Sequence, residues 1–177
     1  MNKRVKNANN LSVGHALRAA EGRIDMTLTQ KENGLISDLE SQEQLCIEKY
    51  RKYENAAQDP CLKQIFSSIR GTEESHLQTV RRIKNGEEVK MPSPPPSAVS
   101  NVASCAPSSL DEAKRREDAY LCADALAMEK HVSSVYDVSV FEFSSPVLRD
   151  TLAHIQKEEQ NHGEMLYSYM SKNGMYS

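Results

Sequence analysis

Two stretches of the sequence decide the fold: IRGTEESHLQTV at residues 69–80 and IQKEEQNHGEML at residues 155–166. Each stretch contains one copy of the motif Glu-x-x-His. The motif residues are Glu73, His76, Glu159 and His162. A spacing of three residues places a carboxylate and an imidazole one turn apart on the same face of an α-helix. The two stretches therefore predict two helices that each present the same pair of polar side chains.

The two motifs belong to a longer repeat with an offset of 86 residues. Another glutamate lies thirty residues before each motif glutamate, at Glu43 and at Glu129. A tyrosine lies seven residues after each of these, at Tyr50 and at Tyr136. Landmarks outside the motifs match as well: Pro60 with Pro146, Leu62 with Leu148, and Ile69 with Ile155. The chain is therefore predicted to contain a duplicated unit.

The first copy of the unit is predicted to be a helical hairpin. Thr29 followed by Glu32 is a capping box, in which the threonine hydroxyl accepts a hydrogen bond from a free backbone amide and the glutamate reaches back to the cap. It opens a helix over residues 29–58. A second helix over residues 60–85 starts at a proline, which suits a first turn, and ends before Gly86.

The second copy repeats this plan. Ser109 with Glu112 is a second capping-box pattern and predicts a helix over residues 109–143. The last helix is expected over residues 146–173, where a proline again occupies the first turn and Gly174 supplies a C-terminal cap.

The two hairpins are joined by a linker over residues 87–108. Its Met-Pro-Ser-Pro-Pro-Pro-Ser run favours extended polyproline geometry over helix. About 22 such residues at about 3 Å each can span a bundle of about 40 Å. We therefore expect a polar N-terminal tail over residues 1–28 and an all-α four-helix bundle over residues 29–177, in which the two hairpins are joined by a long crossover.

A heptad seam indicates which face of each helix the motif residues occupy. Positions spaced alternately by three and four residues are apolar or aromatic in all four predicted helices, apart from the motif residues and Ser139. Residues that are equidistant from a predicted turn lie at the same height in an antiparallel hairpin, which places Glu43 opposite Glu73. Glu40 is a rival for Glu43, but its counterpart at the offset of 86 is Leu126, so the repeat favours Glu43.

The polar seam residues therefore interrupt a core. Burial of even one isolated ion costs several kcal/mol, so four converging carboxylates require positive charge. Two divalent cations balance four carboxylates, and a Glu from each of two helices with a Glu-x-x-His from each of the others is the ligand plan of dimetal-carboxylate bundles. Oxygen and imidazole ligands suit iron, or alternatively manganese. The predicted ligands are Glu43, Glu73, His76, Glu129, Glu159 and His162.

Two tyrosines accompany this ligand set. Helical side chains lean toward the N-terminus, which directs the phenols of Tyr50 and Tyr136 back toward the metal layer. We expect these phenols to hydrogen-bond to the ligands.

The composition excludes other classes of function. With 22 Lys and Arg against 25 Asp and Glu, the formal charge is −3, which gives no electrostatic footprint for nucleic acid or an acidic membrane surface. No stretch is long and apolar enough to span a bilayer, and residues 1–10 lack the apolar region of a signal peptide. The four cysteines form no Cys-x-x-Cys pair for a local zinc or rubredoxin-type site. We expect a cytoplasmic protein without nucleic-acid or membrane partners.

With these ligands, residues 29–173 resemble the ferritin-like superfamily and, within it, the rubrerythrin-like proteins. The resemblance implies two iron ions that react with dioxygen or hydrogen peroxide, a homo-oligomer such as a dimer, and an external electron donor. The sequence departs from rubrerythrins at Val132, where they carry a further glutamate, and it lacks their rubredoxin domain. The stretch LYSYMSKNGMY at residues 166–176 resembles the closing motif of the spore coat protein F family.

These resemblances leave two functional hypotheses. The first is a di-iron oxidoreductase of the peroxidase or ferroxidase type. The alternative is a structural spore coat protein whose bound metals only stabilise the fold.

Overall fold

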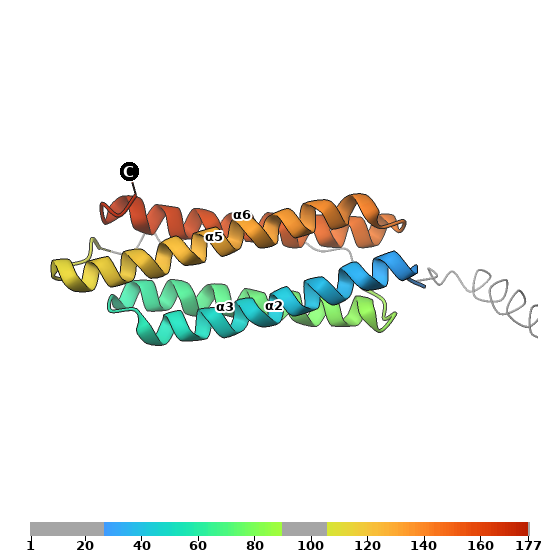
Figure 1. Ribbon diagram of the computed structural model, residues 1–177, viewed down its shortest axis with the longest axis horizontal. Helices are drawn as coiled ribbons and strands as arrows, with labels where there is room; N and C mark the ends of the chain where they lie inside the picture. Colours follow the sequence, from blue (N-terminus) through green and yellow to red (C-terminus); the bar gives the residue numbers. More distant parts are fainter. Residues whose placement is uncertain (1–26, 90–105, 177) are drawn as a thin grey trace, which may run out of the picture.

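Four long helices make up the described part of the chain, which comprises residues 27–89 and 106–176 of the computed structural model. They are α2 (Gln30–Ala56), α3 (Pro60–Lys84), α5 (Glu112–Glu142) and α6 (Pro146–Lys172). Figure 1 shows them side by side, with no strand among the described residues. The predicted all-α four-helix bundle is confirmed. Most of the predicted tail and of the predicted linker lies outside the described residues.

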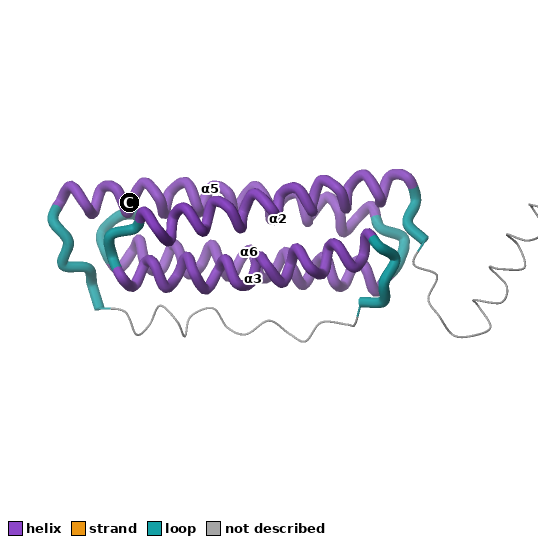
Figure 2. Tube along the Cα trace, turned by 90° about the horizontal axis from the view of Figure 1, so that it is seen from below, coloured by secondary structure: helices purple, strands orange, loops and turns teal. Residues whose placement is uncertain are grey.

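The helices pack as two hairpins. The closest pairings are α2 with α3 and α5 with α6; α2 also packs against α5, and α3 against α6. Figure 2 shows α2 and α5 forming one layer of the bundle, with α3 and α6 beneath them. The end of α3 and the start of α5 lie at opposite ends of the bundle (Figure 1). None of the described helices is long and apolar enough to cross a membrane.

Local signals begin the helices, with one correction. The Thr29 side chain accepts from the Glu32 amide, and the Glu32 carboxylate accepts from the Thr29 amide, as the first capping box predicts. The second capping box, at Ser109, is wrong: α5 starts at Glu112, and its cap is Asp111, which accepts from the amide of Lys114. The reason is tertiary, because the preceding chain is held at the end of α6 by a hydrogen bond of 2.7 Å from the Ser108 amide to the Asn173 side chain.

Glycines end two helices as predicted. Gly86 follows α3 with φ of 69°, and Gly174 follows α6 with φ of 64°. This left-handed conformation is accessible to glycine without the clash that a Cβ would cause.

The predicted heptad seams form a single buried core. Its largest fully buried side chains include Tyr50, Tyr136, Tyr169 and Phe66, and Ser139 is fully buried as well. The Ser139 hydroxyl donates to the carbonyl of Val135 within its own helix, which satisfies the polar group without a partner on another helix.

Each hairpin also holds the turn of the other through one buried carboxylate. Glu32 accepts from the Ser144 amide in the α5–α6 turn at 2.8 Å. Asp118 accepts from the amides of Gln58 and Asp59 in the α2–α3 turn at 2.8 and 2.9 Å. Glu32 and Asp118 are themselves related by the offset of 86 residues. These reciprocal contacts fix the register of the two hairpins, because sliding one hairpin along the other would break both.

Candidate metal centre

Six polar side chains meet in the interior of the bundle, far from its ends. They come from all four helices, and each is at most 4% exposed: Glu43, Glu73, His76, Glu129, Glu159 and His162. These are the six residues that the sequence singled out. Glu40, the rival for Glu43, lies outside this layer and forms ion pairs with Arg81 and Lys84 at 2.9 and 2.7 Å.

The six side chains form two overlapping groups of potential metal ligands. Within each group, one ligand atom from every residue lies within 4.8 Å of the others. The first group is Glu43, Glu73, His76 and Glu159, and the second is Glu73, Glu129, Glu159 and His162. Glu73 and Glu159 occur in both. The arrangement would offer each of two ions one histidine and one glutamate of its own, and Glu73 and Glu159 would be shared between them.

The histidine rings face this layer through equivalent atoms. His76 Nδ1 lies 3.0 Å from Glu159 Oε1 and 3.2 Å from Glu73 Oε2. His162 Nδ1 lies 3.3 Å from Glu73 Oε1 and 3.3 Å from Glu129 Oε2. The ring centroids are 5.9 Å apart. The pseudo-symmetry of the sequence is thus preserved in the side-chain geometry.

Several buried atoms in the layer lack a hydrogen-bond partner, and their chemical types test whether metal ions would fit. The atoms are Glu43 Oε2, Glu73 Oε1, Glu129 Oε2, both carboxylate oxygens of Glu159, and His162 Nδ1. Buried polar atoms without partners are rare and costly, and a ligand that accepts their lone pairs would remove the cost. All of these atoms are ligand types for a divalent cation with a preference for oxygen and imidazole. The residues therefore fit a pair of such ions.

The charges of the metal-free layer offset one another. Burial raises the pKa of Glu43 and of Glu129 well above the usual carboxyl range, which favours their neutral forms. Burial also opposes ionisation of Glu73 and Glu159, but the close histidine rings outweigh it and lower both pKa values. The same contacts raise the pKa of the histidines against the effect of burial. Two carboxylates and two imidazolium rings then sum to zero.

The two predicted tyrosines contact the layer across the hairpin boundary. The Tyr50 hydroxyl of α2 donates to Glu129 Oε1 of α5, and the Tyr136 hydroxyl of α5 donates to Glu43 Oε1 of α2. Burial is the main cause that raises the pKa of both phenols, so they remain donors. Each tyrosine therefore orients the terminal glutamate of the opposite hairpin.

Glu158, the residue before the motif glutamate Glu159, also contacts the site. Glu158 Oε2 lies 2.9 Å from His76 Nε2, on the side of the ring away from the carboxylate layer, and 3.4 Å from His154 Nε2. At the equivalent position beside His162 the chain has Thr72, whose hydroxyl donates to the carbonyl of Ser68. The two candidate metal positions are therefore inequivalent, and only the offset of 86 residues could have signalled this.

Neither group of potential ligands among the described residues includes a cysteine. Cys46 and Cys122 are free and buried in the core, where they pack as small apolar side chains. Burial raises the pKa of the Cys122 thiol to about 12 and raises that of Cys46 as well, which favours the neutral thiol at both positions.

Comparison with known proteins gives one partial match. Residues 117–177 match the Coat F domain, a family model that covers α5 from its second turn, the following turn and α6. The matched hairpin carries Glu129, Glu159 and His162. No curated protein and no solved structure matches the chain. The similarity to spore coat protein F proteins that the C-terminal stretch predicts is therefore supported for the second hairpin.

Proposed function

We propose that this protein is a spore coat component whose four-helix bundle holds two divalent metal ions. The Coat F match over residues 117–177 supports the assignment to the coat. The six-residue layer supports the metal sites, because it supplies two complete ligand groups within one buried core. The metal pair would serve to lock the two hairpins together, since both ions draw ligands from both hairpins.

The residues have distinct roles in this proposal. Glu43 and His76 would bind one ion, Glu129 and His162 the other, and Glu73 and Glu159 both. The tyrosines hold the terminal carboxylates in place, and the surrounding seam excludes bulk water. When bound, iron or manganese at such a site supplies Lewis acidity and redox chemistry.

Metal analysis tests the proposed sites. The metal-free protein is loaded with ferrous iron or with manganese, passed through a desalting column and analysed for metal by elemental analysis. We expect about two ions per chain, as the ligand plan dictates. A Glu73→Gln/Glu159→Gln variant, which removes both bridging carboxylates, serves as the control and is expected to retain far less than one ion. A folded parent that retains no metal would contradict the proposal.

The assignment to the coat has a separate test. Antibody against the protein is applied to fractions of spores from the source organism, divided into coat extract and core. We expect the protein in the coat extract. Its confinement to the core or to vegetative cells would contradict this part of the proposal.

A second candidate function is redox chemistry with dioxygen or hydrogen peroxide, as in a di-iron peroxidase or ferroxidase. The observation that favours it is a groove on the bundle surface that is lined by two of the ligand carboxylates, Glu129 and Glu159. Such a groove would give a small oxidant a path to the ligands. In this reading an external protein supplies electrons, and a homodimer is the expected assembly. Peroxide-dependent oxidation of the ferrous protein, followed by absorbance, would support the redox function, and ferrous protein that is inert to peroxide would exclude it.

A further inference from the structure

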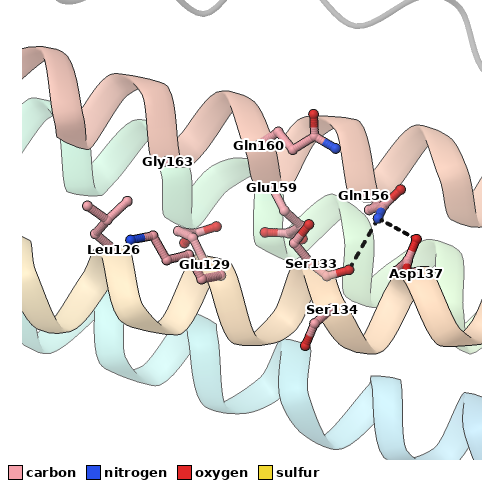
Figure 3. A pocket seen from close by; sticks show the side chains of 10 residues that line it. Leu126, Glu129, Ser133, Ser134, Asp137, Gln156, Glu159, Gln160 and Gly163 are labelled. Carbon is pink, nitrogen blue, oxygen red and sulfur yellow. Dashed lines mark hydrogen bonds between the residues drawn. The ribbon is translucent and has the colours of Figure 1, made fainter.

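A groove runs between α5 and α6 and reaches the candidate metal centre. Its volume is about 490 Å³, and its lining includes Glu129 and Glu159. These two residues are only 2% and 1% exposed, so they lie at the bottom of the groove. Figure 3 shows both carboxylates in the space between the two helices, with Ser133 and Gln156 farther along it. We call this feature the α5–α6 groove.

The duplicated hairpin provides an internal comparison, because each groove residue has a counterpart 86 positions earlier. Ser133 corresponds to Ile47, and Gly163 corresponds to Leu77. Ile47 and Leu77 are 4% and 6% exposed, so their side chains are packed into the bundle. A hydroxymethyl group and a hydrogen atom occupy the equivalent places on the α5–α6 side. The smaller side chains leave open the space that the larger ones fill on the α2–α3 side.

In a third pair of counterparts, the smaller and less tightly held side chain is again on the α5–α6 side. Arg70 of α3 is fixed by ion pairs to Glu74 at 2.7 Å and to Glu54 at 3.2 Å. Its counterpart in the groove is Gln156, which makes hydrogen bonds of 3.4 Å to the Ser133 carbonyl and to an Asp137 carboxylate oxygen (Figure 3). Hydrogen bonds of this length are weak. The groove residue therefore offers a polar side chain that can turn aside, whereas the α2–α3 side has a bulky cation held in place.

Packing does not account for the glycine at position 163. A Cβ at this position would lie 3.5 Å from Leu126 Cδ1, which is an ordinary van der Waals contact, and the residue has no positive φ that would require glycine. Glycine inside a helix costs about 1 kcal/mol relative to alanine. The helix accepts this cost at a position where any side chain would extend into the groove.

The charge of the groove suits a cation. Its lining contains the carboxyl groups of Asp137, Glu159 and Glu129, the last of which burial favours in the neutral form, against the single ammonium of Lys130. Acidic clefts concentrate cations and raise their association rates by about 10 to 10³. The serine and glutamine side chains provide oxygen atoms that can replace water around an ion on its way inward.

We propose that divalent metal ions enter and leave the candidate metal centre through the α5–α6 groove, and that Gly163 and Ser133 keep this path open. The inference rests on the proposed metal sites and adds a route to them. The first ligands met along this route are Glu129 and Glu159, so the ion beside His162 is loaded from the groove and the ion beside His76 lies farther in.

The test places the residue types of the α2–α3 side at the equivalent positions of the α5–α6 side. In a Ser133→Ile/Gly163→Leu variant, cobalt uptake by the metal-free protein is followed by stopped-flow absorbance, and release is followed after addition of a chelator. We expect uptake to slow by about tenfold or more, because the two larger side chains fill the path and a barrier raised by about 1.4 kcal/mol already slows a step tenfold. Release should slow by the same factor, with two ions still bound at equilibrium, because a closed path raises the barrier in both directions and leaves affinity unchanged.

Two further variants keep the test decisive. Gly71→Leu introduces the same side chain on the exposed face of α3, where no atom lies within 4 Å of the added Cβ, and should bind cobalt at the parental rate. Gly163→Ala fits without a clash and should slow uptake to a smaller extent while resisting heat at least as well as the parent. If both groove variants take up two cobalt ions at the parental rate, the route is wrong. A parent that binds no cobalt would overturn the metal sites, and the route with them.

Discussion

Replacement of the entire polar layer by apolar side chains should leave a folded bundle. In this apolar-layer variant the six ligand residues become leucine and the two tyrosines that donate to them become phenylalanine. Within the layer, donors and acceptors are removed together; Glu158 loses His76 but is partly exposed to solvent and retains its contact with His154. Each heptad seam becomes continuous. The change separates the stability of the fold from the presence of metal.

The expected magnitude follows from the polar atoms that the layer leaves unsatisfied. Five carboxylate oxygens and one imidazole nitrogen of the ligands have no hydrogen-bond partner. Such atoms cost about 1 to 3 kcal/mol each, and the ion pairs within the layer return part of this. Replacement of buried ionic networks by packed apolar groups is neutral or stabilising by about 1 to 4 kcal/mol. At about 3 °C per kcal/mol for a domain of this size, the variant should melt up to about 12 °C above the metal-free parent.

The metal-loaded parent and a variant with one substitution serve as references for this comparison. Each bound ion at a concentration of about 100 times its Kd should stabilise the parent by about 2.7 kcal/mol, or about 5 kcal/mol for two ions. A single Glu159→Leu substitution should do the opposite, with a loss of about 3 to 5 kcal/mol, because it removes a charge that both histidines face. The single substitution thus measures the penalty for a stranded charge.

The assay is thermal unfolding followed by circular dichroism, with metal removed by a chelator or added in excess. The metal-free parent should have the lowest melting temperature and the metal-loaded parent the highest. The apolar-layer variant should melt between them, close to the metal-loaded parent. An apolar-layer variant that loses its helices, or melts well below the metal-free parent, would refute the reasoning, since it would mean that the polar layer itself specifies the fold. A parent whose melting temperature does not respond to metal would remove the proposed locking role.

Two further predictions concern single carboxylates outside the ligand set. Glu158→Ala should lower the affinity for the ion beside His76 by about 10- to 100-fold and leave the other affinity unchanged, because His76 loses the carboxylate that orients its ring. The matched control Thr72→Ala should change neither affinity. A calorimetric titration with manganese distinguishes the two sites. Glu32 should stabilise the fold by about 3 kcal/mol at pH 7, because burial raises its pKa but hydrogen bonds from Ser144 and Thr29 outweigh this and lower it to about 2. This contribution is present above the ordinary carboxyl pKa near 4.5 and is lost as the pH falls toward 2. Urea unfolding should therefore show Glu32→Gln to be less stable than the parent at pH 7 and equal to it near pH 2. A stability difference that does not depend on pH would contradict the assignment.

The sequence alone was sufficient for the helices and for the candidate ligands. Helical periodicity is a local property, so the seams of all four helices follow from spacing within each segment. The repeat with an offset of 86 residues then selects Glu43 over Glu40, because only Glu43 has a glutamate as its counterpart. Chain geometry supplies the remaining step, since residues equidistant from a turn must meet in an antiparallel hairpin.

Other features depend on which side chains face one another between hairpins, and only the tertiary structure decided these. The phenol of Tyr50 reaches Glu129 of the other hairpin, and Glu158 contacts His76 from α6. The failure of the capping box at Ser109 has the same origin, because a contact with the end of α6 holds the chain that leads into α5.

The α5–α6 groove illustrates the distinction most clearly. The sequence shows that Gly163 replaces Leu77 and that Ser133 replaces Ile47, but it does not show that the two replacements border a single space. Periodicity assigns each side chain to a face of its own helix. Whether two faces close or leave a gap depends on the rotation and separation of the packed helices, which are set by the summed packing of the whole core and by no single segment.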